Sequence, residues 1–314
     1  MRTRNKARVL AAALVTIAPL ASVSPAFAGG YGPAETVPSQ QPATPKGTPA
    51  PEAGACEKNI AVMVPATLNT KRTSNPDNPH GIGSRTVGNA LSQEPDTMVV
   101  TVPYNSAYPL MKISYNDSQQ EGVNATTQMM TQKAAECPNS YFSIFGYSSG
   151  ADIVAEVVSD INANRGPIPG DRLTAAVILS SPARNSATTT AIEGGTAAGN
   201  GAAAIKPAFD YGQLGDKVLE YCNTGDITCD TTNVLPGFAS LPLEGFFDFA
   251  PRNGQFTPGA FYDIANAAFS SPAKFQQLMN EAPELIPSFI RHLTYLVPGD
   301  GIDKSIQFIK ERNV

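Results

Sequence analysis

Residues 146–150 read Gly-Tyr-Ser-Ser-Gly, which has the G-x-S-x-G spacing typical of a serine nucleophile. The segment directly follows the apolar run 141–145 and directly precedes a helical pattern that begins at Ala151. Strand, turn and helix in this order predict a sharp elbow, where side chains at the flanking positions would collide with neighbouring backbone. The alternative is a Gly/Ser turn that matches this spacing by chance. The place of the segment between a strand and a helix favours Ser148 as a nucleophile.

A serine hydroxyl needs a nearby base that accepts its proton close to neutral pH, and histidine is the usual one. The chain has two histidines, His80 and His292. In a strand-elbow-helix fold of this type the chain order is serine, acid, histidine. This order excludes His80 and selects His292 as the base.

The acid that orients the imidazole must lie between Ser148 and His292. Asp226 lies in the segment Cys-Asn-Thr-Gly-Asp-Ile-Thr-Cys, residues 222–229, just after an apolar run. A disulfide across this loop would fix the carboxylate at the carboxyl edge of a sheet, where the elbow also lies. Asp226 is therefore the expected acid. Its rivals, most of them expected to be solvated, are Asp152, Asp210, Asp216, Asp230, Asp248 and Asp263.

Acyl chemistry at a serine also needs donors for the developing oxyanion, one of them the backbone N–H of the residue after the nucleophile. That residue is Ser149. The second donor is expected from the loop after the first strand, where Thr67 could add its hydroxyl to its amide. The alternative for Thr67 is ordinary turn chemistry.

Short β-rich runs alternate with helical patterns along the chain, and this alternation predicts an α/β fold with a mainly parallel sheet covered by helices on both faces. The expected strands are 59–64, 97–102, 141–145, 173–179 and 217–221. The expected helices are 83–93, 118–135, 151–164, 273–279 and 302–312. With the elbow, this is an α/β-hydrolase arrangement.

Two stretches break the alternation. Residues 186–204 are dominated by Ala, Gly and Thr with no visible period, and we expect a mobile surface loop. Residues 235–269 carry many phenylalanines among Pro and Gly. This aromatic-rich segment is interpreted either as the underside of a cap over the site or as ordinary core.

The N-terminus has the pattern of a secretory signal, which would be cleaved after Ala28. Four basic residues within the first eight precede an apolar stretch, 9–23, which is short for a membrane span and contains Pro19. Residues 29–55, rich in Pro, Gly and Thr, are expected to be a flexible linker. Residues 56–314 would then form one hydrolase domain.

Removal of residues 1–28 takes away four positive charges, so the formal net charge changes from −5 to −9. This charge disfavours a nucleic-acid partner. No other segment is apolar enough to span a bilayer, which leaves a soluble protein or one in peripheral contact with the cell envelope.

The chain has four cysteines, which in an exported protein favour two disulfides over metal ligands. Four cysteines allow three pairings, and the spacing favours Cys222–Cys229 together with Cys56–Cys137. Because only one closely spaced pair exists, a structural zinc site is not expected. No metal or organic cofactor is implied.

These motifs together resemble those of the cutinases. The resemblance rests on Gly-Tyr-Ser-x-Gly after the Cys-Pro-Asn at 137–139 and on the Cys-x3-Asp-x2-Cys loop at 222–229. Within that family, the stretches 75–79, 102–104, 114–118 and 159–161 are similar to the cutinase-like envelope lipid esterases of mycobacteria and corynebacteria. The match covers about residues 56–229 well and the remainder weakly.

The resemblance implies a secreted Ser-Asp-His esterase acting on lipid acyl esters, with phospholipase A or thioesterase activity in the mycolate cell envelope. It assigns the triad roles to Ser148, Asp226 and His292 and the oxyanion hole to Thr67 and Ser149. His292 fits through the His-x-x-Tyr at 292–295. We expect a monomer. The rivals are an acyltransferase that uses the same triad and a non-catalytic lipid-binding protein.

Overall fold

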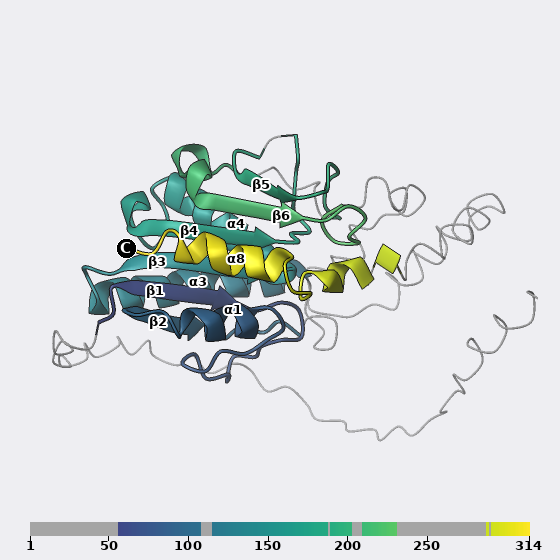
Figure 1. Cartoon of the computed structure of the whole chain (residues 1–314). Coiled ribbons are helices and arrows are strands. Elements are labelled where there is room, and N and C mark those ends of the chain that lie inside the picture. The colour runs from purple at the N-terminus through teal and green to yellow at the C-terminus, as the bar shows by residue number, and fades with distance from the viewer. Residues whose placement is uncertain (1–55, 108–114, 188, 203–208, 231–286, 289) are drawn as a thin grey trace, which may run out of the picture. The chain divides into compact units, whose positions relative to one another are not determined.

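The computed structural model describes residues 56–107, 115–187, 189–202, 209–230, 287–288 and 290–314 (Figure 1). Four expectations lie outside these residues: the signal segment 1–28, the linker 29–55, the helix 273–279 and the aromatic-rich segment 235–269.

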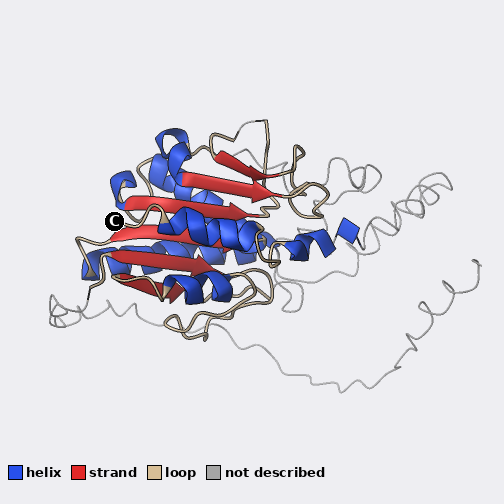
Figure 2. Cartoon of the chain, viewed as in Figure 1, coloured by secondary structure: helices blue, strands red, loops and turns tan. Residues whose placement is uncertain are grey.

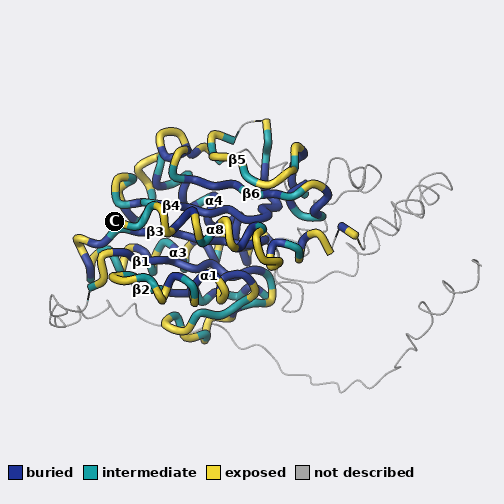
Figure 3. Tube along the Cα trace, viewed as in Figure 1, coloured by how far each residue is buried: buried dark blue, intermediate teal, exposed yellow. Residues whose placement is uncertain are grey.

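Within the described residues, six parallel strands form one sheet in the order β2-β1-β3-β4-β6-β5. The strands are β1 (Asn59–Val64), β2 (Thr97–Thr101), β3 (Tyr141–Tyr147), β4 (Leu173–Leu179), β5 (Ile192–Gly195) and β6 (Val218–Cys222). β1, β3 and β4 are almost wholly buried, as continuous apolar strands between two helical layers must be (Figure 3).

Helices of the described residues cover both faces of the sheet (Figure 2). Alternate side chains of β1 divide between the faces: Ile60 and Val62 pack with α3 (Tyr115–Glu136) and α4 (Ser149–Asn162). Ala61 and Met63 lie in the opposite cluster, with α1 (Ser84–Leu91) and α8 (Gly301–Lys310). This period of two is the reason why strand patterning in the sequence predicts the layers.

The bounds of the elements differ from expectation by a few residues. β1 and β4 match, whereas β2, β3 and β6 differ by one or two residues at one or both ends. α4 begins at Ser149, immediately after the expected nucleophile, and α3 begins at Tyr115. Two short 3-10 helices, η1 (Gly170–Arg172) and η2 (Gly212–Lys217), precede β4 and β6.

The expectation of a loop throughout residues 186–204 is wrong in one part, because β5 lies there and pairs with β6 at the sheet edge. β5 has four largely exposed residues, Ile-Glu-Gly-Gly, which carry no alternating pattern. Arg184 is buried beside it and contacts Glu193 at 2.9 Å as well as the carbonyl oxygens of Ala197 and Gly199. The strand is thus stabilised by tertiary contacts that no local pattern shows.

Candidate active site

The elbow at the carboxyl end of β3 holds Ser148 with φ 55° and ψ −124°. A positive φ is uncommon for a residue other than glycine and marks a constrained turn. A Cβ at Gly146 would lie 2.2 Å from the carbonyl oxygen of Gly150, and a Cβ at Gly150 would lie 2.4 Å from that of Val64. Both glycines are therefore needed for the turn to pack between β3, α4 and β1.

His292 lies within hydrogen-bonding distance of both expected partners. Its Nε2 is 3.1 Å from Oγ of Ser148, and its Nδ1 is 3.0 Å from Oδ1 and 3.3 Å from Oδ2 of Asp226. The histidine lies in a helical segment that includes residues 290–294, near the chain's end and ahead of α8. The structure thus brings Ser148, His292 and Asp226 into the connectivity of a catalytic triad.

Tyr147, the residue before the nucleophile, supports the imidazole. Its ring stacks on that of His292 with a centroid separation of 5.1 Å and an interplanar angle of 18°. Its hydroxyl donates to the carbonyl oxygen of His292. Burial, followed by the charge of Asp226, raises the pKa of Tyr147, so the hydroxyl keeps its proton and remains a donor.

Asp226 is fully buried and is surrounded by hydrogen-bond donors. Oδ2 accepts from the hydroxyls of Ser180 at 2.5 Å and Tyr295 at 2.6 Å. Oδ1 accepts from the backbone N–H and the hydroxyl of Thr228, each at 2.8 Å. Burial alone would raise the pKa of Asp226, but its bonds to His292, Ser180 and Tyr295 and the charge of His292 hold that pKa below its usual value.

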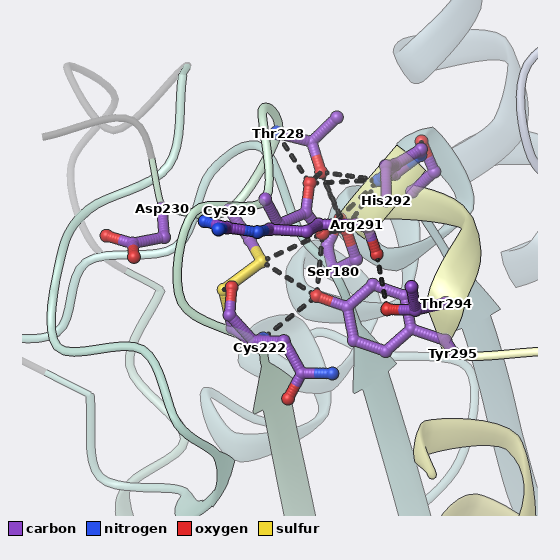
Figure 4. A network of polar contacts seen from close by, with 12 residues as sticks. Ser180, Cys222, Thr228, Cys229, Asp230, Arg291, His292, Thr294 and Tyr295 are labelled. Atoms are coloured by element: carbon purple, nitrogen blue, oxygen red, sulfur yellow. Dashed lines mark hydrogen bonds and ion pairs between the residues drawn. A yellow bond between two sulfur atoms is a disulfide. The ribbon is translucent and has the colours of Figure 1, made fainter. Parts of the chain in front are cut away.

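The loop that presents Asp226 is closed by the Cys222–Cys229 disulfide, with a Cα–Cα distance of 6.0 Å (Figure 4). The hydroxyl of Tyr295 also accepts from the N–H of Asn223 at 2.9 Å, which ties the His292 segment to this loop. The second disulfide joins Cys56, ahead of β1, to Cys137, ahead of β3. These are the pairings that the spacing favours.

The two residues expected at the oxyanion hole, Thr67 and Ser149, contact each other. Oγ1 of Thr67 donates to Oγ of Ser149 at 2.9 Å. Ser149 is the first residue of α4, so its N–H has no acceptor within the helix. Thr67 follows β1, the strand next to β3, and its loop therefore reaches the elbow. This arrangement can present backbone and hydroxyl donors beside Ser148.

The other acidic residues and His80 make different contacts. His80 bonds to Oγ1 of Thr70 at 2.9 Å and to the carbonyl oxygen of Asn78 at 2.8 Å. Asp210 and Asp216 are exposed, as expected for solvated rivals, while Asp248 and Asp263 lie outside the described residues.

Two of the rivals, Asp152 and Asp230, are buried rather than solvated. Asp152 accepts from the hydroxyls of Tyr115 and Ser181, each at 2.5 Å. Asp230 accepts from the N–H of Gly225 inside the acid loop. Hydroxyl and backbone donors, rather than a histidine, thus face these two carboxylates.

Sequence reasoning assigned no role to four side chains that touch the triad: Tyr147, Ser180, Thr228 and Tyr295. Tyr147 lies inside the G-x-S-x-G motif and Thr228 inside the cysteine loop 222–229, so both could have been found from the sequence. Ser180 follows β4 directly, and the one sequence signal for it was its place at the carboxyl end of a buried strand.

Among the described residues, no group of three or more His, Cys, Asp or Glu side chains is arranged to hold a metal ion. None of the described helices has the length and apolar character needed to cross a membrane.

Comparison with known proteins points to one family. The family model for cutinases matches residues 63–240, which is more than half of the chain. A protein named "Carboxylesterase Culp6 homolog" from Corynebacterium glutamicum is 28% identical over 158 residues, 43% of this chain and 51% of the relative. Cutinase 11 of Verticillium dahliae is 29% identical over 131 residues, 38% of this chain and 43% of that protein. The chain thus spans about half the length, or less, of these relatives.

A solved structure of an acetyl xylan esterase shares the fold. It has a TM-score of 0.50 and 17% identity, and the match covers 83% of this chain and 100% of that one.

Proposed function

The chain belongs to the cutinase family, and from this premise we propose that it is a serine carboxylic ester hydrolase whose nucleophile is Ser148. One observation carries the proposal: Oγ of Ser148 lies 3.1 Å from Nε2 of His292, while Nδ1 of the same ring faces the buried carboxylate of Asp226. A base that is held on one side and open to a strained serine on the other is what acyl transfer to serine requires.

In the proposed reaction, Nε2 of His292 takes the proton from Ser148 as Oγ attacks the ester carbonyl. The oxyanion forms beside the N–H of Ser149 and the Thr67 loop, and Asp226 stabilises the imidazolium. Collapse of the tetrahedral intermediate transfers the proton to the leaving alcohol and leaves an acyl-enzyme. Water, activated by the same imidazole, then attacks the acyl-enzyme and releases the carboxylic acid and Ser148.

We further propose that the substrates are lipid acyl esters, phospholipid or thioester substrates included. Exposed apolar side chains on the two segments that carry Thr67 and His292 support this substrate class. Leu68 is 56% exposed, Leu293 40% and Ile290 55%. Apolar side chains around a hydrolytic site suit an acyl chain better than a sugar.

We propose an extracytoplasmic location for the enzyme, in peripheral contact with the mycolate-containing cell envelope. The two disulfides support an oxidising compartment, and the signal pattern at residues 1–28 supports export.

The test of the proposal is hydrolysis of p-nitrophenyl esters of increasing acyl length by the full chain and by Ser148→Ala. We expect kcat to fall by about 10⁴-fold or more in the variant, because triad members act as a unit. Ser92→Ala, an exposed serine after α1, is the matched control and should keep full activity. Intact-mass analysis with a fluorophosphonate should show one adduct on the wild type and none on Ser148→Ala.

The same experiment separates the alternatives. Ester products that appear only with an added alcohol acceptor would indicate an acyltransferase. Lipid binding without any fluorophosphonate adduct would indicate a non-catalytic protein and would refute the proposal.

A further inference from the structure

The side chain of Ser180 touches two members of the triad, although no sequence motif includes it. We propose that Ser180 is a positioning residue, which holds the imidazole of His292 with its proton on Nδ1 and Nε2 free to accept from Ser148. The inference rests on the proposed function and adds a fourth side chain to its machinery.

The position of Ser180 follows from the topology of the sheet. β4 lies between β3, which ends at the nucleophile, and β6, which leads into the acid loop, and Ser180 is the first residue after β4. Its N–H donates to the carbonyl oxygen of Tyr221 on β6 at 2.8 Å. Its φ is 57°, in the left-handed region that residues other than glycine seldom adopt, and its side chain is fully buried. A buried residue with a strained backbone at the carboxyl end of a strand is typical of a functional constraint.

The proton of the Ser180 hydroxyl can be assigned by counting donors. Oγ of Ser180 lies 2.5 Å from Oδ2 of Asp226, 2.6 Å from Oγ1 of Thr228 and 3.0 Å from Nδ1 of His292. An ionised carboxylate only accepts, so the short contact to Oδ2 takes the single proton of Ser180. The oxygen of Ser180 is then left with lone pairs that face Thr228 and Nδ1.

Nδ1 of His292 therefore faces a set of acceptors. Asp226 Oδ1, Ser180 Oγ and Thr228 Oγ1 each lie 3.0 Å from it. Thr228 shares its proton between Asp226 and Ser180, at 2.8 and 2.6 Å, so neither hydroxyl has to donate to the ring. The arrangement favours the tautomer with the proton on Nδ1 and gives the imidazolium formed during the reaction more than one acceptor.

Ser181 offers a matched control for Ser180. It is the next residue, it is equally buried, and its hydroxyl also donates to a buried aspartate at 2.5 Å, but that aspartate is Asp152. A purely structural role for a buried serine would be disturbed equally in both variants. A positioning role would be disturbed only in Ser180→Ala.

The experiment compares wild type, Ser180→Ala and Ser181→Ala as full chains, with kcat and KM for a p-nitrophenyl ester and the rate of fluorophosphonate labelling. We expect Ser180→Ala to lower kcat and the labelling rate by about tenfold or more, with KM within about twofold, because one hydrogen bond to a charged pair is lost. Ser181→Ala should keep the wild-type kcat. Glycine accepts a φ of 57° without strain, so Ser180→Gly should show the same loss of kcat and labelling rate as Ser180→Ala. It replaces the alanine variant if that variant folds poorly.

A second readout is the downfield proton resonance of Nδ1–H. It should be visible in the resting wild type and in Ser181→Ala, and it should broaden or be lost in Ser180→Ala as the proton exchanges faster with water. This readout needs no substrate, so it tests Ser180 even if the wild type fails to react with the fluorophosphonate and the proposed function falls. The proposal for Ser180 is overturned if Ser180→Ala keeps the wild-type resonance, or if Ser181→Ala loses as much kcat as Ser180→Ala.

Discussion

The carboxylate of Asp226 shows how a fully buried charge is kept ionised. Three side-chain hydroxyls and one backbone N–H donate to it in addition to the imidazole. Without these donors burial would favour the neutral acid, which could not stabilise an imidazolium. The polar shell around Asp226 is thus part of the site's chemistry as well as of its stability.

Tyr295→Phe tests this shell, because it removes one of the two hydroxyl donors to Oδ2 and keeps the ring. The lowered pKa of Asp226 gives the folded state a stabilisation that is present above the ordinary value of about 3.9 and is lost as the pH falls through the folded-state pKa. The variant should raise that pKa, so acid unfolding should begin at a higher pH. At neutral pH we expect about 1–3 kcal/mol less stability.

The measurement for Tyr295→Phe is circular dichroism during acid titration, since the chain contains no tryptophan. Tyr221→Phe is the matched control: its ring lies edge-on to Tyr295, but its hydroxyl bonds to Asp300 at 2.8 Å. An equal shift of the acid midpoint in both variants would contradict the assignment.

The two disulfides belong to opposite ends of the strands and should have separable effects. Cys222–Cys229 follows β6 and closes the loop of Asp226, whereas Cys56–Cys137 precedes β1 and β3. By loop-closure entropy the first, with a sequence separation of 7, stabilises by about 2 kcal/mol, and the second, with a separation of 81, by about 4 kcal/mol.

We therefore expect Cys222→Ala/Cys229→Ala to lower kcat more than Tm, because the acid loop loosens. Cys56→Ala/Cys137→Ala should lower Tm more and leave the kcat of the folded enzyme unchanged. Kinetics below the melting transition and calorimetry on both double variants check this. Equal kcat losses in the two would show that the acid loop does not depend on its disulfide.

The strands that could be predicted are those whose own residues carry the signal. β1 and β4 are dominated by apolar residues, and their bounds match the expectation. β5 could not be predicted, because four largely exposed residues, two of them glycines, show no period. Pairing with β6 and the contacts of Arg184 form the strand instead. Local propensity fails where tertiary contacts decide.

The site shows the same division. Ser148, Asp226 and His292 were expected from motif spacing and chain order, and the structure places the imidazole of His292 within hydrogen-bonding distance of the other two. Ser180 could not be found in this way, since a serine after a strand is common. Only the order of strands in the sheet places it between the nucleophile and the acid. Residues that act through topology are therefore missed by motifs.

Across the fold, buried carboxyl groups differ in whether their ionisation stabilises or destabilises the folded state. Glu220 lies on β6 and is nearly fully buried, and its Oε2 has no hydrogen-bond partner among the residues that the structure describes. Burial raises the pKa of Glu220, and its hydrogen bond to Thr189 and the charge of Arg184 offset this only in part. Two residues of one strand–loop unit, Glu220 and Asp226, thus have pKa values displaced in opposite directions.

Glu220→Gln should therefore stabilise the fold at neutral pH. A raised carboxyl pKa means that the folded state retains a proton that the unfolded chain has released, so wild-type stability falls as the pH rises from about 4.3 through the folded-state pKa. Glutamine keeps the shape and cannot ionise, so its gain should be absent near pH 4 and grow toward neutral pH. Calorimetry across this range measures it, with the exposed Glu57→Gln as the control that should show no such growth. A Glu220→Gln variant that is less stable than wild type at neutral pH would mean that the charge of Glu220 is needed to balance Arg184, and that burial does not dominate at this position.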